Sequence, residues 1–220
     1  MSAWLKWAVL AWVLAIAAFH LVSAACGHSA YRDVYLMTAL EYAKGPIDLP
    51  RPVVLGFNLN HTPTPHDFPL WQATAALVFK AFGTWFGWAN LVSLVYLFSC
   101  LYPLYRLAGR YGERGRGWRT LLLFLAQPLV VMRAGLAGFD GLSLAAAVWF
   151  LFFAVRLTEE PGLKWFVPTA LLGALSVVLK LPFFLLAGLA WFFLVVARLF
   201  WRGRCTSMLA SRRRSCPWRT

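Results

Sequence analysis

Long apolar stretches separated by short polar ones dominate the pattern of the chain. They lie at about residues 7–25, 84–105, 120–134, 141–157, 165–180 and 182–199. A helix needs about 20 apolar residues to cross the hydrocarbon of a bilayer, so the first two stretches and the last are long enough to cross alone. The pattern predicts an all-α, polytopic membrane protein with about six transmembrane helices.

The third stretch, residues 120–134, differs from the others. It is short, contains Pro128 and reaches Arg133 near its end. Short or proline-interrupted segments at membrane depth commonly line a cavity inside a helix bundle. We therefore expect this segment to face the protein interior.

Residues 27–83 form a long loop between the first two spans. Within it, residues 34–44 have apolar side chains at helical spacing and end at Gly45-Pro46, a common helix terminator. Pro69 then opens a second helix over residues 70–82, which is apolar on most faces but too short to cross a membrane. The sequence predicts two interfacial helices in this loop.

The second of these helices carries two residues typical of the membrane interface. Trp71 is expected at headgroup level, and Lys80 is long enough to extend its amine to water.

The composition supports a membrane protein and distinguishes between lipid and nucleic acid as its partner. The chain is 61% hydrophobic and 17% aromatic, with a mean hydropathy of +0.66 and a net charge of +13. The basic residues cluster between apolar stretches, as topology determinants do, and do not alternate with exposed stacking aromatics. We expect the partner to be the lipid bilayer and not nucleic acid.

Arginine placement predicts the orientation. The loop between the second and third spans is short and rich in arginine, which places it in the cytoplasm by the positive-inside rule. Both termini are then cytoplasmic, and residues 27–83 lie outside together with the turns around 134–140 and 180–182. The first stretch is too long for a signal-peptide core, so we interpret it as an uncleaved transmembrane helix.

The domain organisation follows from this threading. Residues 1–200 are expected to form one membrane domain, with 27–83 as its outer loop. Residues 201–220 are basic and lack periodicity, so we expect a disordered tail that could be a premature or frame-shifted end.

Two acids lie at the predicted outer edge of the hydrocarbon. Ionised carboxylates are costly there, which makes Asp33, just after the first span, and Asp140, just before the fourth, candidates for function. The alternatives are an ion pair of Asp33 with Arg32 and capping of the helix at Gly141 by Asp140.

Cations near the same edge could bind phosphate. Lys80, Arg133 and Lys180 each end an apolar segment within reach of a headgroup. The alternative for each is simple extension of the side chain to the interface. His66 and Asp67, with His61, match no standard metal-ligand spacing, so we expect a loop that contacts water or headgroups.

Several of these residues, in order, resemble a known family. They are the acid after the first span, the two interfacial helices, Gly83, the Arg133…Asp140 turn, and the segments Asp67-Phe68-Pro69-Leu70-Trp71-Gln72 and Gly173-Ala174-Leu175-Ser176-Val177-Val178-Leu179-Lys180-Leu181-Pro182. Over about residues 5–197 the chain resembles the N-terminal half of a C-type (GT-C) membrane glycosyltransferase of the protein O-mannosyltransferase and aminoarabinose-transferase group.

The resemblance implies transfer of a sugar from a polyprenyl-phosphate carrier to an acceptor at the outer face of the membrane, by inversion. Asp33 would act as the base, and Asp140 would bind the acceptor or a divalent cation. Whether such a cation is a cofactor stays an open alternative. The lipid phosphate would contact the four cations Arg32, Lys80, Arg133 and Lys180. His66 and Asp67 would lie in a loop near acceptor or donor. We expect a multi-pass protein of a bacterial inner (plasma) membrane.

Two other functions stay open. One is a truncated, non-catalytic membrane protein that binds the carrier lipid or other proteins. The other is a small transporter component, although the chain lacks the inverted half-repeats typical of transporters. The absence of a GxGxxG pattern argues against sugar nucleotides as donors. Sugar, acceptor and oligomeric state are not determined by the sequence.

Overall fold

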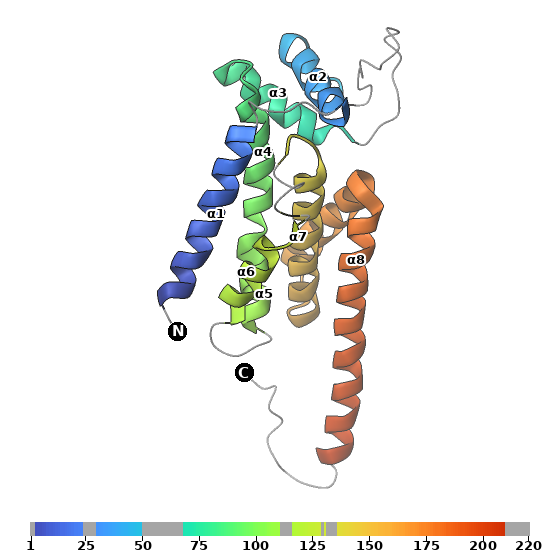
Figure 1. Cartoon of the computed structure of the whole chain (residues 1–220). Coiled ribbons are helices and arrows are strands. Elements are labelled where there is room, and N and C mark those ends of the chain that lie inside the picture. Colours follow the sequence, from blue (N-terminus) through green and yellow to red (C-terminus); the bar gives the residue numbers. More distant parts are fainter. Residues whose placement is uncertain are drawn as a thin grey trace.

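The computed structural model describes residues 3–23, 30–49, 68–110, 116–128, 130 and 136–209, which are helices joined by short connections (Figure 1). The helices are α1 (Ala3–Ser23), α2 (Ala30–Lys44), α3 (Leu70–Phe82), α4 (Phe86–Ser99), α5 (Leu101–Arg110), α6 (Arg116–Leu125), α7 (Asp140–Glu159) and α8 (Leu163–Leu209). The described residues include no strand, so the all-α prediction is confirmed for this part of the chain.

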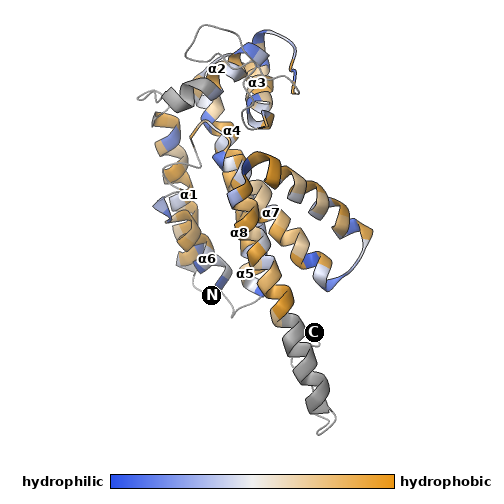
Figure 2. Cartoon of the chain, turned by 90° about the vertical axis from the view of Figure 1, so that its right-hand side faces the viewer, coloured by the Kyte–Doolittle hydropathy of each residue, from blue (hydrophilic) through white to orange (hydrophobic). Residues whose placement is uncertain are grey.

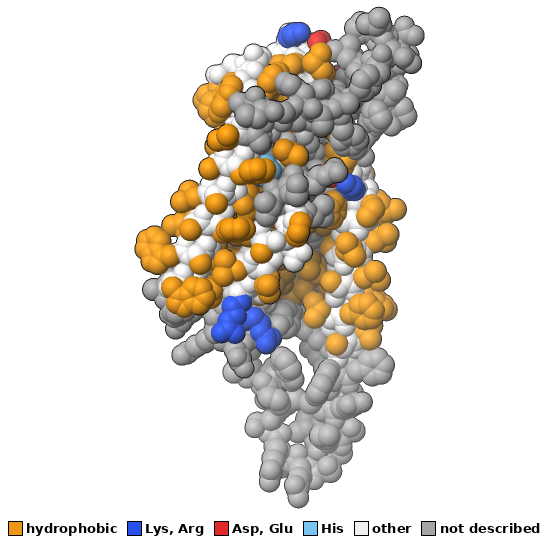
Figure 3. Space-filling model, viewed as in Figure 1, with side chains coloured by type: hydrophobic (Ala, Val, Ile, Leu, Met, Phe, Trp, Pro, Cys, Tyr) orange, Lys and Arg blue, Asp and Glu red, His pale blue; other side chains and the backbone are white. Residues whose placement is uncertain are grey.

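Four helical segments of the described residues are long and apolar enough to cross a membrane. They are Trp4–Val22, Phe86–Arg110, Asp140–Glu159 and Leu163–Ala197. Hydrophobic residues run along these helices in Figure 2, and in Figure 3 a hydrophobic belt separates arginine and lysine side chains below it from charged side chains above. The chain thus has the character of a membrane protein.

The helices differ in how deeply they are packed. In the most apolar part of α7, 61% of the residues are buried within the protein, against 22% in α1 and in α8. α7 is therefore the central helix, while α1 and α8 present apolar side chains such as Trp7 and Leu186 outward, where lipid would cover them.

α2 and α3 pack against each other across one end of the bundle (Figure 1). We call this the α2–α3 end, and the opposite end, where Arg110 pairs with Glu159, the Arg110 end. The core at the α2–α3 end includes Leu36 from α2 and Trp71 from α3, together with residues of α4, α7 and α8. Both helices predicted in the 27–83 loop are thus present, and the bounds predicted for the second match α3.

Glycine ends α3. Gly83 has φ of +86°, a backbone conformation that side chains disfavour, and its amide donates to the Phe79 carbonyl over 2.9 Å. The chain can then turn directly into α4.

Proline residues explain two interruptions in the helices. α4 and α5 form one continuous segment with a break at Cys100, where Pro103 cannot donate to the Ser99 carbonyl. α6 starts at Arg116 and ends at Leu125, before Pro128, because a proline disfavours helical backbone in the residue before it. The helix is thus shorter than the predicted third span, of which residue 129 and residues 131–134 lie outside the described part.

α8 bends at Lys180, whose φ of −164° and ψ of 96° are not helical. The bend divides α8 into two arms that run in different directions (Figure 1), at the same place where the sequence separates its last two spans. α8 continues as a helix to Leu209, past residue 200, where the sequence predicts the end of the membrane domain. Helix propagation needs only one hydrogen bond per added residue and can pass the end of an apolar run.

Candidate functional site

An ion pair joins the start of α7 to the bend in α8. Lys180 Nζ lies 2.6 Å from Asp140 Oδ1, and the side chains are 37% and 29% exposed, respectively. Both residues were candidates from the sequence, although they are far apart along the chain. Their partial burial leaves the pair open to a ligand while it excludes part of the surrounding solvent.

The local backbone explains why these two side chains meet. Asp140 occupies the first turn of α7, where the helix dipole favours a negative charge. Ser143 anchors this turn, since its hydroxyl donates to the Phe139 carbonyl over 2.9 Å. Pro182 lies in the first turn of the second arm of α8, a position that proline tolerates, so the bend leaves Lys180 beside the start of α7.

Aromatic rings surround the lysine of the pair. Lys180 Nζ lies 5.0 Å from the ring centroid of Phe139 and 5.4 Å from that of Phe183. The electron-rich faces of such rings attract a cation. The Phe139 ring also makes an edge contact with Tyr35 of α2, with centroids 5.1 Å apart. One aromatic contact thus links the ion pair to α2.

α2 is also the helix of two other predicted site residues. Arg32 and Asp33 belong to its first turns, shortly before Tyr35, and their side chains lie outside the described part of the structure. The helix that carries the predicted base therefore contacts Phe139, the aromatic neighbour of Lys180, through Tyr35, and the role of Asp33 stays a prediction.

Lys80 is not brought to this pair. Its Nζ donates to the Gly45 carbonyl over 2.8 Å at an exposed position, which ties the end of α3 to the end of α2. This bond favours a structural role for Lys80 over its predicted contact with a phosphate. Arg133, His66 and Asp67 lie outside the described residues.

A buried polar network beneath the pair was missed by the sequence analysis. Fully buried Asn90 donates to the His20 carbonyl over 2.6 Å and accepts from the Ala137 amide over 3.0 Å. It therefore holds the end of α1 and the segment before α7 against α4. Its signal in the sequence is a single amide within an apolar span.

Trp71 takes part in a second chain of buried hydrogen bonds, so its ring faces the protein core, and its predicted headgroup depth stays a prediction. Its indole is fully buried and donates to Ser93 Oγ over 2.9 Å, and this hydroxyl donates in turn to the Gly138 carbonyl over 3.3 Å. A buried tryptophan needs a partner for its N–H, and Ser93 of α4 supplies one.

Metal binding has no support in the part of the chain that the structure describes. No group of three or more histidine, cysteine, aspartate or glutamate side chains there is arranged to hold an ion. Asp140 instead has a lysine beside it, which competes with a cation for the same carboxylate.

Comparisons of the chain with models of protein families, with curated proteins and with solved structures found no match. Over the residues that the structure describes, the fold is all-helical, with four apolar helical segments able to cross a membrane.

Proposed function

We propose that this protein transfers a sugar from a polyprenyl phosphate to an acceptor at the α2–α3 end of the bundle. The observation that carries the proposal is the Asp140–Lys180 pair, a partly buried cation and carboxylate at the end of an apolar helix bundle. A lipid phosphate with its hydrocarbon chain in the bilayer would present its charge at this depth.

The proposed reaction is a single displacement. Asp33 takes the proton of the acceptor hydroxyl, and the acceptor oxygen forms a bond to the anomeric carbon. The bond from that carbon to the phosphate oxygen breaks, and its electron pair leaves with the polyprenyl phosphate. Lys180 neutralises the charge on this leaving phosphate, and Asp140 orients the lysine and binds the acceptor.

The proposal includes a topology. Each of the two arms of α8 is one membrane crossing. A further crossing comes from α6 and the residues that follow it. α2 and α3 lie at the outer interface. The N-terminus is then cytoplasmic, in a bacterial inner membrane. The bend at Lys180 and the position of α2 and α3 across one end of the bundle support this arrangement.

The test uses vesicles that contain the purified protein and a polyprenyl phosphate with a radiolabelled sugar. We expect wild-type protein to release label, Asp33→Asn to bind the lipid without turnover, and Lys180→Met to lose both turnover and tight binding. Lys164→Met is the matched control, because Lys164 is an exposed lysine in an ion pair with Glu160 and lies outside the site. It should keep full activity.

The other outcomes are equally informative. Binding without turnover in the wild type would favour a non-catalytic protein that holds the carrier lipid. Equal activity in Lys180→Met and Lys164→Met would remove the Asp140–Lys180 pair from the mechanism. Absence of both binding and turnover in the wild type would contradict the proposed function.

A further inference from the structure

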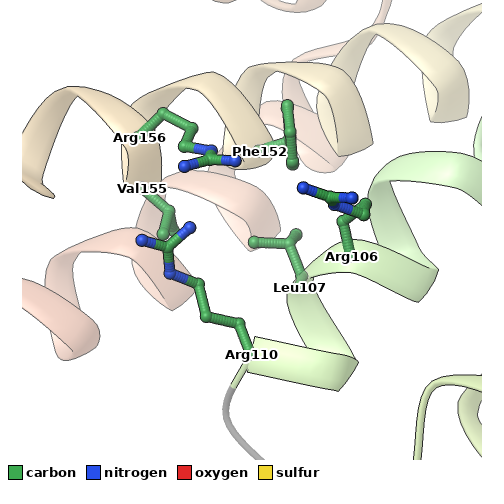
Figure 4. A pocket seen from close by; sticks show the side chains of 6 residues that line it. All are labelled: Arg106, Leu107, Arg110, Phe152, Val155 and Arg156. Atoms are coloured by element: carbon green, nitrogen blue, oxygen red, sulfur yellow. The ribbon is translucent and has the colours of Figure 1, made fainter. Parts of the chain in front are cut away.

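A second charged site lies at the Arg110 end, away from the Asp140–Lys180 pair. A small pocket between α5 and α7 is lined by Arg106, Leu107, Arg110, Phe152, Val155 and Arg156. In Figure 4 the three arginine side chains extend into the space between the two helices. We infer that this pocket binds the phosphate of an anionic phospholipid in the leaflet at this end.

The charges in the pocket are only partly balanced. Arg110 forms an ion pair with Glu159, whose side chain is 10% exposed. Among the described residues, no carboxylate is in ion-pair contact with Arg106 or Arg156. Glu160 interacts electrostatically with Arg156, but its hydrogen bonds come from Lys164 and Trp165. Two guanidinium groups are thus available to an anion.

One of these groups has a buried donor without a partner. Arg156 Nε is shielded from solvent, and no acceptor for it occurs in the part of the chain that the structure describes. A buried donor of this kind costs free energy unless it is bonded, and a charged one costs more. A phosphate oxygen in the pocket would accept from it.

Aromatic rings hold both guanidinium groups in place. The Cζ atom of Arg156 lies 5.7 Å from the ring centroid of Phe152 and 5.5 Å from that of Trp165, and Arg106 lies 5.8 Å from Tyr102. An arginine side chain that is already held in one conformation loses less conformational entropy when its planar guanidinium binds two phosphate oxygens. The aromatic contacts therefore prepare the pocket for a phosphate.

The position and size of the pocket favour a lipid over a free anion. It lies at the ends of two segments able to cross a membrane, Phe86–Arg110 and Asp140–Glu159, and is thus at headgroup depth. Its volume of about 10 Å³ admits roughly one oxygen atom, so the remainder of a headgroup would rest on the surface. The side chains of Leu107 and Phe152 add apolar surface to the lining of the pocket.

The experiment measures lipid retention by the full chain in vesicles of phosphatidylcholine with a minor fraction of phosphatidylglycerol, read by native mass spectrometry after transfer to detergent. We expect wild-type protein to retain phosphatidylglycerol selectively. Arg106→Gln and Arg156→Gln should each weaken retention about fivefold, the effect of one basic residue near an anionic headgroup. Arg119→Gln, an exposed arginine of α6 outside the pocket, is the matched control and should be unchanged.

Two results would overturn the inference. One is equal retention in the Arg106, Arg156 and Arg119 variants, which would indicate non-specific attraction to a basic surface. The other is displacement of the lipid by inorganic phosphate at similar concentration, which would indicate a site for a free anion. If Arg156→Gln does not fold, Arg156→Lys keeps the charge without the planar fork and should bind with intermediate strength. Exposed Arg106 provides an independent variant.

Discussion

Lys180 combines three physical roles at one position. Its backbone forms the bend in α8, its amine pairs with Asp140, and its charge lies over the Phe139 and Phe183 rings. A charged side chain near hydrocarbon is costly, and these contacts reduce that cost while the amine stays partly exposed. Such a position is suited to a ligand that replaces water.

Part of this site could be predicted from residue type alone. Asp140 and Lys180 were identified because charges are rare at the ends of apolar segments. Their direct contact could not be predicted, since it depends on the packing of α7 against α8. For the same reason, the burial of Trp71 was missed: its partner Ser93 is unremarkable in sequence.

Asn90 provides a test of the buried network. Asn90→Ala removes the partners of the His20 carbonyl and the Ala137 amide. The loss of a hydrogen bond costs each of these two buried groups about 1–3 kcal/mol, so we expect the free energy of unfolding to fall by about 2–6 kcal/mol. Ser176→Ala is the control, because the hydroxyl of buried Ser176 donates to the Leu172 carbonyl within its own helix. Denaturant unfolding in detergent would measure both, and equal losses would contradict the role of Asn90.

The raised pKa of Tyr42 leads us to expect a loss of folding stability at high pH. Burial, and then the negative charge of Asp48, raise the pKa of Tyr42 above its ordinary value of 10.0. The folded state therefore favours the neutral phenol, which donates to the Asp48 carbonyl over 2.7 Å. This contribution is complete below the ordinary pKa and is lost as the pH rises above it.

The measurement is the unfolding midpoint from about pH 8 to about pH 11 in wild type and Tyr42→Phe. We expect the difference between the two proteins to shrink as the pH rises, because only the wild type loses a hydrogen bond. A difference that stays constant across this range would contradict the argument.

At the scale of elements, the spacing of apolar residues predicted helix bounds well where proline and glycine mark the helix ends. Pro69 and Gly83 enclose α3, and its predicted bounds agree with the structure. The bounds were less well predicted where the ends depend on tertiary contacts or on weak termination. α6 ends sooner than its apolar pattern, and α8 continues beyond its own.

Two glycines in α8 test how tightly its first arm packs on α7. A methyl group at Gly173 would lie 3.2 Å from the Phe150 ring, whereas one at Gly188 would meet nothing within 4 Å. Alanine in place of glycine stabilises a helix by about 0.5–1 kcal/mol. We expect this gain for Gly188→Ala, and a smaller gain or a loss for Gly173→Ala, in thermal unfolding. A full gain at Gly173 would show that the α7–α8 interface is loose.

At the scale of the whole molecule, charge separates the two ends. The Arg110 end holds Arg106, Arg110 and Arg156, and the α2–α3 end holds the Asp140–Lys180 pair. By the positive-inside rule the Arg110 end would face the cytoplasm, and this orientation stays a prediction.

Two lysines allow a matched test of this topology. Lys44 and Lys164 are 73% and 68% exposed, each beside a glutamate of its own, at opposite ends of the molecule. In a protein without its native cysteines, we expect Lys44→Cys to react with a membrane-impermeant maleimide added to intact cells. Lys164→Cys should react only after permeabilisation. The reverse result would place the Asp140–Lys180 pair in the cytoplasm and contradict the proposed reaction.

The length of α7 between its two charged ends relates the protein to the thickness of the membrane. Asp140 at its start and Arg156 near its end both need an aqueous boundary, and at 1.5 Å per residue they are about 24 Å apart. A bilayer with a much thicker hydrocarbon layer would submerge one of these charges unless the bundle deformed the surrounding lipid. The spacing of these two charges therefore limits the hydrocarbon thickness that α7 could cross with both of them at water.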